Sequence, residues 1–465
     1  MTTLAWQSIT ELARQIAGKK LSPLELVDAQ LARIERLDPK WHAFIRVLPD
    51  RARAQARAAE AEIAAGRHRG PLHGIPVGLK DIIDVAGVAT TCHSKIYADH
   101  VATSSAVVTD KLEAEGAVVM GKMSTHEFAI GGPSFDLPWP PAINPWGGAN
   151  FPGGSSSGSG VALATGMLPA ALGTDTGGSV RNPASMCGIV GLKPTYGRVS
   201  RRGVYPLAFS LDHVGPMTRD VADNALVLQA LAGHDPLDPG SANVAVPDFS
   251  TEIGRGVKGL RIGLVRHFYD GDETAHPEQI KAVDEAAEIL RRLGADVREI
   301  QLAPLAEYTL CNRVILASEA FAIHRRHLSE RPGDYGALAR QRLAVGAGLA
   351  AADYVDALRL RARLIAQTNA AMEGLDGLLT VSSMDPPPPI ADAAECARVY
   401  PRQARQPFNV TGQPAIAIPA GFTPDGLPLS IQIVGHNWQE ARVYRIAHAY
   451  EDATGWGKRH PPGLD

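Results

Sequence analysis

The sequence predicts an α/β fold, because short apolar runs that suit buried strands alternate with helical patterns along almost the whole chain of 465 residues. The clearest unit is a strand at 260–265, an amphipathic helix at 277–293 and a second strand at 296–302. Two more apolar runs, at 414–422 and 429–435, have the length and composition of central strands. The sequence has no internal repeat, so we expect an ordinary α/β core.

The N-terminal region has the pattern of packed helices. Ser8 and Ser22 each precede an apolar helical pattern and are followed three residues later by a glutamate, as in a capping box. A third stretch, at about 50–65, is mostly alanine, arginine and glutamate, which favours a helix with a solvated face. We expect these helices to pack on the outside of the core.

The composition limits the classes of partner. The net charge of −3, from 46 basic and 49 acidic residues, gives no electrostatic reason to expect nucleic acid or a membrane surface. The N-terminus lacks the features of a signal peptide and no apolar run is long enough to span a bilayer, so we expect a cytoplasmic protein. The four cysteines are far apart and the histidines form no ligand pattern, so no metal site is predicted.

Residues 153–181 are the strongest candidate for an active site. Five serines and many glycines lie in this stretch, and glycine leaves backbone amides open to a substrate. One short pattern in it, Gly154 to Gly158, fits the nucleophile elbow of an esterase, in which Ser156 would need an aspartate and a histidine as partners. Elsewhere, residues 116–123 approach a phosphate-binding loop but end in methionine where that motif requires serine or threonine.

A lysine and two serines can supply the chemistry of amide hydrolysis. Ser179 follows two glycines and can act as the nucleophile, with open amides of the same turn as donors to an oxyanion. Lys80 ends an apolar run that reads as a buried strand, and burial lowers the pKa of a lysine toward the working pH, where the neutral amine is a base. Ser155 would relay protons between the two.

Each of these features also has a purely structural interpretation. Lys80 could form an ion pair with Asp81 or Asp84, and the serines at 155–157 could belong to a flexible linker. Ser179 could be the N-cap of a helix. The three features together favour the catalytic interpretation.

The motifs around these residues closely resemble those of the amidase signature family. The resemblance rests on residues 153–156, followed after a helix of small residues by residues 173–181. The spacings also fit the family, with 75 positions from Lys80 to Ser155 and 24 from Ser155 to Ser179. Further matching motifs cover most of the chain and lie at 74–76, 80–81, 191–195, 211–216 and 408–414.

The resemblance implies a single large α/β domain whose mixed central sheet is flanked by helices on both faces. Within this continuous domain, residues 1–70 would be a helical region packed on the core and residues 71–465 the catalytic domain. In the family's Ser-Ser-Lys triad, Ser179 would be the acylated nucleophile, Ser155 a bridging serine after a cis peptide bond, and Lys80 the base. The backbone amides of the oxyanion hole would be those of Thr176, Gly177, Gly178 and Ser179.

The substrate pocket is predicted from the same resemblance. In relatives the segment at 131–141 borders the acyl pocket, and here it is rich in proline and aromatic residues, which suits aryl amides, anilides or carbamates. Ser157 stands where the family more often has glycine, and its hydroxyl could alter the hydrogen bonds of the proton relay. The residues predicted to bind substrate are Ile130, Gly131, Gly132 and Ser156.

The resemblance predicts an amidohydrolase that cleaves a carboxylic amide, or a related anilide, urea or carbamate, through a seryl acyl-enzyme and releases ammonia or an amine. Its partner would be a small-molecule amide, with no nucleic acid, membrane, metal or cofactor. A homodimer is possible, since homodimers are common among relatives, but the sequence does not give the oligomeric state. The alternative function is that of the glutaminase component of a tRNA-dependent amidotransferase, which works in complex with partner subunits.

Overall fold

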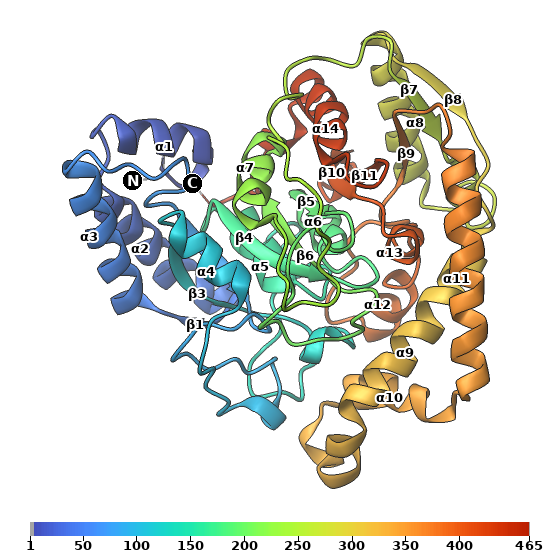
Figure 1. Ribbon diagram of the computed structural model, residues 1–465, viewed down its shortest axis with the longest axis horizontal. Helices are drawn as coiled ribbons and strands as arrows, with labels where there is room; N and C mark the ends of the chain where they lie inside the picture. Colours follow the sequence, from blue (N-terminus) through green and yellow to red (C-terminus); the bar gives the residue numbers. More distant parts are fainter. Residues whose placement is uncertain (1–3, 465) are drawn as a thin grey trace.

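One mixed β-sheet runs through the computed structural model, which describes residues 4–464 (Figure 1). The strands are β1 (Phe44–Val47), β2 (Pro76–Lys80), β3 (Val118–Met123), β4 (Ala170–Asp175), β5 (Val190–Lys193), β6 (His213–Thr218), β7 (Arg261–Leu264), β8 (Asp296–Glu299), β9 (Gly377–Val381), β10 (Ala415–Phe422) and β11 (Pro428–Val434). Within the described residues these eleven strands follow the order β1-β3-β2-β4-β6-β5-β10-β11-β9-β7-β8. β2 is parallel to β3 and β4, β7 is parallel to β8 and β9, and the other pairs are antiparallel.

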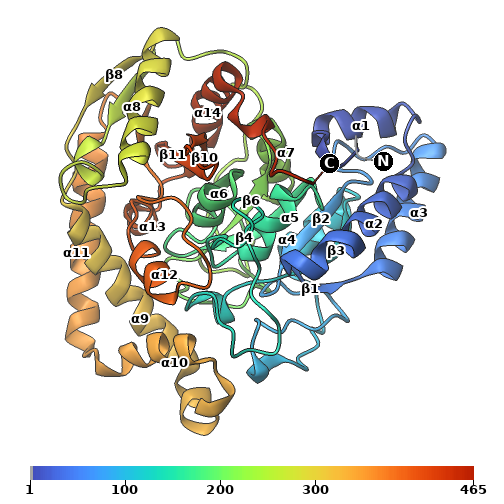
Figure 2. The ribbon, with the colours of Figure 1, turned by 180° about the vertical axis from the view of Figure 1, so that it is seen from behind.

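Helices cover both faces of this sheet (Figures 1 and 2). They are α1 (Ile9–Ala17), α2 (Pro23–Trp41), α3 (Pro49–Ala64), α4 (Val107–Ala114), α5 (Ser157–Ala164), α6 (Arg181–Cys187), α7 (Val221–Leu231), α8 (Pro277–Arg292), α9 (Leu305–Glu330), α10 (Ala337–Ala344), α11 (Ala351–Ala371), α12 (Ala393–Val399), α13 (Gln406–Thr411) and α14 (Glu440–Thr454). Side chains alternate between the faces of a strand, so β3 places Val119 in one apolar core and Val118 in another. The first core lies mainly under α1, α4, α7, α8 and α14, and the second mainly under α2, α3, α5 and α6. The predicted α/β domain with a mixed sheet between helices is confirmed.

The elements with clear local signals form where the sequence predicts them. The Ser8 hydroxyl accepts a hydrogen bond from the Glu11 amide at the start of α1, and the Ser22 hydroxyl caps α2 in the same way. The predicted strand, helix and strand between 260 and 302 are β7, α8 and β8. Of the helices within residues 4–464, none is both long and apolar enough to cross a membrane.

Three strands are not predicted by the sequence. β1 lies within the region of residues 1–70 that is expected to be helical, and it pairs with β3. β5 is short and contains glycine, and β6 contains both Gly215 and Pro216, although proline is rare inside central strands. Here Pro216 lies opposite Leu172 in the interior of the sheet, so tertiary packing overrides the local preference. The domain boundary after residue 70 stays a prediction.

The sheet brings together two segments that lie far apart in the sequence. β2 and β4 are parallel neighbours, with Leu79 opposite Leu172. The carboxyl ends of parallel strands meet at the same edge of a sheet, where ligand sites of α/β proteins are usual. Lys80 at the end of β2 therefore lies next to Thr174 and Asp175 at the end of β4.

Candidate active site

Lys80 is fully buried and its amine contacts two hydroxyl groups. Its Nζ atom donates hydrogen bonds to Ser155 Oγ and to Thr174 Oγ1, each at 2.7 Å. The link to Ser155 is the one that the sequence predicts, across 75 positions of chain. The contact with Thr174 is not predicted, because nothing in the motif distinguishes this hydroxyl from the others nearby.

The alternative interpretation of Lys80 as an ion-pair residue is wrong. Asp81 instead pairs with Lys122, with 2.7 Å between Lys122 Nζ and Asp81 Oδ1 and both side chains fully buried. No salt bridge found among residues 4–464 includes Lys80. The lysine is thus left as a buried amine among hydroxyl groups.

Burial has the predicted effect on the acidity of this amine. Removal from water lowers the pKa of Lys80 from 10.5 to about 7, although the more distant carboxylates of Asp212 and Asp175 oppose the change. At neutral pH a large fraction of the lysine is therefore uncharged and able to accept a proton.

The backbone around Ser155 is fixed by its neighbours. The peptide bond between Gly154 and Ser155 is cis, as the resemblance implies. The Ser155 carbonyl accepts hydrogen bonds from the His126 amide at 3.0 Å and from the Thr125 hydroxyl at 2.9 Å. A Cβ atom on Gly154 would clash with the ring of the buried His126, so any other residue here would displace that ring.

The serines near Ser155 have structural contacts. Ser156 Oγ donates to the Thr174 carbonyl at 3.3 Å and accepts from the Thr174 amide at 3.2 Å. No histidine contacts this hydroxyl among the residues that the structure describes, which leaves the esterase hypothesis without its base. Ser157 begins the buried helix α5, so the flexible-linker interpretation is also wrong.

The turn that carries Ser179 is organised by Asp175. One carboxylate oxygen accepts from the Gly178 amide at 2.8 Å and from Asn409 at 2.8 Å, and the carboxylate also binds Arg181 Nε at 3.0 Å and Nη2 at 2.9 Å. Although burial opposes ionisation, the Arg181 guanidinium and the Asn409 amide hold the pKa of Asp175 well below its usual range. α6 then begins at Arg181, with Val180 and not Ser179 at its N-cap.

One of the four backbone amides predicted to form the oxyanion hole already donates a hydrogen bond within the protein. Because the Gly178 amide already donates to Asp175, it is not free for a substrate. The amides of Thr176, Gly177 and Ser179 have no acceptor anywhere in the described chain. Three adjacent donors are therefore available beside the Ser179 hydroxyl, out of the four predicted.

Ser179 opens onto a cavity of about 370 Å³. Ser179 is 7% exposed and shares the cavity wall with two residues predicted to bind substrate, Ile130 and Gly131. Gly132 lines a smaller neighbouring cavity, and Ser156 lines neither. The substrate contacts of all four residues stay a prediction, but the structure brings only the first two to the serine.

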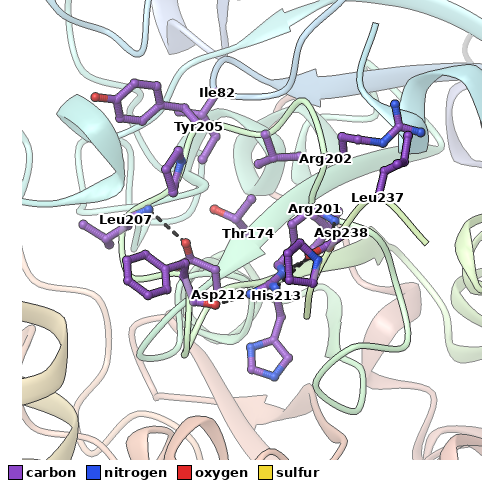
Figure 3. A pocket seen from close by; sticks show the side chains of 15 residues that line it. Ile82, Thr174, Arg201, Arg202, Tyr205, Leu207, Asp212, His213, Leu237 and Asp238 are labelled. Atoms are coloured by element: carbon purple, nitrogen blue, oxygen red, sulfur yellow. Dashed lines mark hydrogen bonds and ion pairs between the residues drawn. The ribbon is translucent and has the colours of Figure 1, made fainter. Parts of the chain in front are cut away.

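A second cavity, of about 190 Å³, lies beside Thr174, the residue that contacts Lys80 (Figure 3). Thr174 and Asp212 both line it. Asp212 Oδ1 accepts from the Thr176 hydroxyl at 2.6 Å, which ties the wall of this cavity to the oxyanion turn. Burial raises the pKa of Asp212 to about 6.

Comparison with known proteins agrees with this geometry. The sequence pattern of the family described as Amidase matches residues 25–444. This chain belongs to the amidase signature family. It is thus an enzyme of a family that acts on carbon–nitrogen bonds. The predicted absence of a metal and of a cofactor stays a prediction.

Individual relatives give more detail. The A subunit of glutamyl-tRNA(Gln) amidotransferase from Geobacter metallireducens is 42% identical, and the match covers 97% of each chain. The solved structure of the protein with the same name from Thermotoga maritima is 33% identical, with a TM-score of 0.81 over 97% of this chain and 95% of that one. The peptide amidase of Stenotrophomonas maltophilia is 31% identical, with a TM-score of 0.87 over 99% of both chains.

These relatives overturn the predicted partners. The expectation of a small-molecule amide as the only partner, with no nucleic acid, is wrong, because full-length relatives at this identity are named as subunits of an enzyme of glutamyl-tRNA. The net charge of −3 did not reveal this. Net charge reports on direct contact with phosphates, whereas one subunit can work on a nucleic acid that other subunits hold.

Proposed function

We propose that this chain is the glutaminase component of a tRNA-dependent amidotransferase, and that it releases ammonia from glutamine for the amidation of glutamyl-tRNA. The observation that carries the proposal is the 42% identity, over 97% of both chains, with the glutamyl-tRNA(Gln) amidotransferase protein of Geobacter metallireducens. The bond that this enzyme hydrolyses is the carbon–nitrogen bond of the side-chain carboxamide of glutamine, which is a linear amide. A cytoplasmic location, also predicted from the sequence, belongs to the same proposal.

The catalytic steps assigned to the triad follow from the chemistry of its groups. Neutral Lys80 takes a proton from Ser155, which takes one from Ser179, and Ser179 Oγ attacks the carboxamide carbon. The negative oxygen of the tetrahedral intermediate accepts from the free amides of Thr176, Gly177 and Ser179. The returning proton goes to the departing nitrogen, which leaves as ammonia, and water then hydrolyses the acyl-enzyme to glutamate.

The hydrogen bonds at Lys80 support this assignment of the base. Both of its contacts are hydroxyl oxygens at 2.7 Å, and neither is a charged group that would hold the ammonium form. Burial lowers the pKa of Lys80 to about 7, which suits a base that works near neutral pH.

A transfer assay tests the proposal. The tagged chain, purified with its native partner subunits, is given glutamine labelled with ¹⁵N in the amide, glutamyl-tRNA and ATP, which activates the carboxylate. The wild type should move the label to the tRNA-bound amino acid, and Ser179→Ala should not. Added ammonium should restore transfer in Ser179→Ala, because it bypasses glutamine hydrolysis. Hydrolysis of glutamine by the wild type with no transfer to tRNA, or transfer from glutamine by Ser179→Ala, would contradict the proposal.

A further inference from the structure

A second buried arginine lies beside the turn that carries Ser179. Arg405 immediately precedes α13 and is 1% exposed. Its Nη1 atom donates to the Ser382 carbonyl at 2.9 Å and also contacts the Ser383 hydroxyl. Its Nε atom is buried and has no hydrogen-bond partner.

Arg405 has no carboxylate of its own. The nearby carboxylate, Asp175, is bound by Arg181 through two hydrogen bonds, and no salt bridge in residues 4–464 includes Arg405. Burial, followed by repulsion from Arg181, lowers the pKa of Arg405 to about 9. Of these two buried guanidinium groups only that of Arg181 binds the carboxylate, and a buried charge without a partner costs folding free energy.

The guanidinium stem packs directly on the oxyanion turn. A Cβ atom on Gly178 would lie 2.4 Å from Arg405 Nε and 2.7 Å from its Cδ, so the absence of a side chain at Gly178 is what lets Arg405 approach. Gly178 also has a φ of +120°, which other residues rarely adopt. The positive charge therefore lies against the backbone between the free amides of Gly177 and Ser179.

We propose that Arg405 is a positioning residue that acts through this turn, and that its uncompensated charge stabilises the oxyanion formed at the amides of Thr176, Gly177 and Ser179. The inference rests on the proposed function, because it concerns the same reaction. In a water-excluded site a fixed cation favours a negative charge that develops nearby. The resting enzyme carries this cation at a cost to its stability, and the cost is offset only when the oxyanion forms.

The variant Arg405→Met separates this role from a structural one. Removing the side chain leaves both of its acceptors with a donor, since the Ser382 carbonyl also accepts from the Ala404 amide at 3.2 Å and the Ser383 hydroxyl from Asn182 at 3.3 Å. We therefore expect Arg405→Met to unfold at the same urea concentration as the wild type or at a higher one. The kcat for ammonia release from glutamine by the purified complex should fall about 10-fold or more, with KM little changed.

A transition-state mimic gives the second readout. A boronic acid adds to the serine hydroxyl and forms a tetrahedral anion, whereas glutamate, the product, does not. Arg405→Met should weaken binding of the boronic acid by the same factor as kcat and leave binding of glutamate unchanged. Arg405→Lys, which keeps the charge, should recover most of the loss. Arg398→Met, at an exposed arginine in α12, is the matched control and should behave as wild type.

Three results would overturn the inference: an unchanged kcat in Arg405→Met, a loss of activity that matches a loss of urea resistance, or unchanged binding of the boronic acid. If Arg405→Met does not fold, Arg405→Lys and Arg405→Gln are compared instead, because only the first keeps the charge. Arg405→Lys should then have the higher kcat and bind the boronic acid more tightly, and equal values in the two variants would overturn the inference. Activity in Ser179→Ala would instead reject the proposed function itself, whatever Arg405 does.

Discussion

Replacing Lys80 with methionine tests the physical basis of the proposed base. Methionine has a similar length but cannot be protonated, so Lys80→Met should release no ammonia from glutamine. The lowered pKa also has a consequence for stability. Between a folded-state pKa of about 7 and the unfolded value of 10.5, the unfolded chain binds a proton at this residue that the folded chain does not. The free energy of unfolding of the wild type should therefore rise with pH across this window.

The size of the effect follows from the change in pKa. A fall from 10.5 to about 7 corresponds to about 5 kcal/mol in total, of which about 2 kcal/mol should be recovered between pH 7 and pH 9. The quantity to measure is the difference in free energy of unfolding between Lys80→Met and the wild type, from urea titrations at several pH values. Other titrating groups cancel in this difference. We expect the free energy of unfolding of the wild type to rise by about 2 kcal/mol relative to that of Lys80→Met over this range.

The activity of the wild type supplies an independent check. Since only the neutral amine acts as a base, kcat/KM should rise about 10-fold between pH 6 and pH 8, with its midpoint near 7. A difference in unfolding free energy that stays constant from pH 7 to pH 9 would show that the pKa of Lys80 is not lowered. A kcat/KM that is flat between pH 6 and pH 8 would show that Lys80 is not the base.

Three further variants test the rest of the site. Thr174→Val removes an acceptor that favours the ammonium form of the base, so the midpoint of the pH–kcat/KM profile should move below 7. Gly154→Ala should abolish ammonia release, because the new methyl group would lie 2.0 Å from a ring carbon of His126, whereas Gly333→Ala, with nothing within 4 Å, should retain it. Asp175→Asn leaves a buried guanidinium without its carboxylate and should lower the urea-derived free energy of unfolding by about 3–5 kcal/mol; an unchanged value would contradict the role given to this ion pair.

The parts of the site that could be predicted have local signals. An apolar run that ends in Lys80 indicates a buried amine, and paired glycines before Ser179 indicate an open turn. Caps such as that at Ser8 fix the start of a helix through contacts within three residues. Each of these inferences needs only the chemistry of neighbours in the sequence, and the structure contains each of the local features.

The parts that could not be predicted depend on distant residues. Asp81 follows Lys80 directly, yet it pairs with Lys122, which lies far along the sequence on the neighbouring strand β3. Likewise, the Gly178 amide looks like an oxyanion donor in the motif, but the carboxylate of Asp175 already accepts from it. A motif gives the identity of such groups, and only the fold decides which hydrogen bonds remain free.

The same distinction applies to Arg405, which lies outside the glycine- and serine-rich stretch. In the sequence it is one of many arginines, and since most arginines in proteins lie on the surface, nothing in the sequence indicates that this one is buried. The fold instead buries it against Gly178, whose amide is already bonded and whose missing side chain leaves room for a guanidinium group. Gly178 thus cannot donate to the oxyanion, but its lack of a side chain allows the positive charge of Arg405 to lie close to the oxyanion. The two consecutive glycines before Ser179 therefore have different roles. Gly177 offers its free amide to the substrate, and Gly178 has no side chain that would keep the guanidinium group of Arg405 away from the turn.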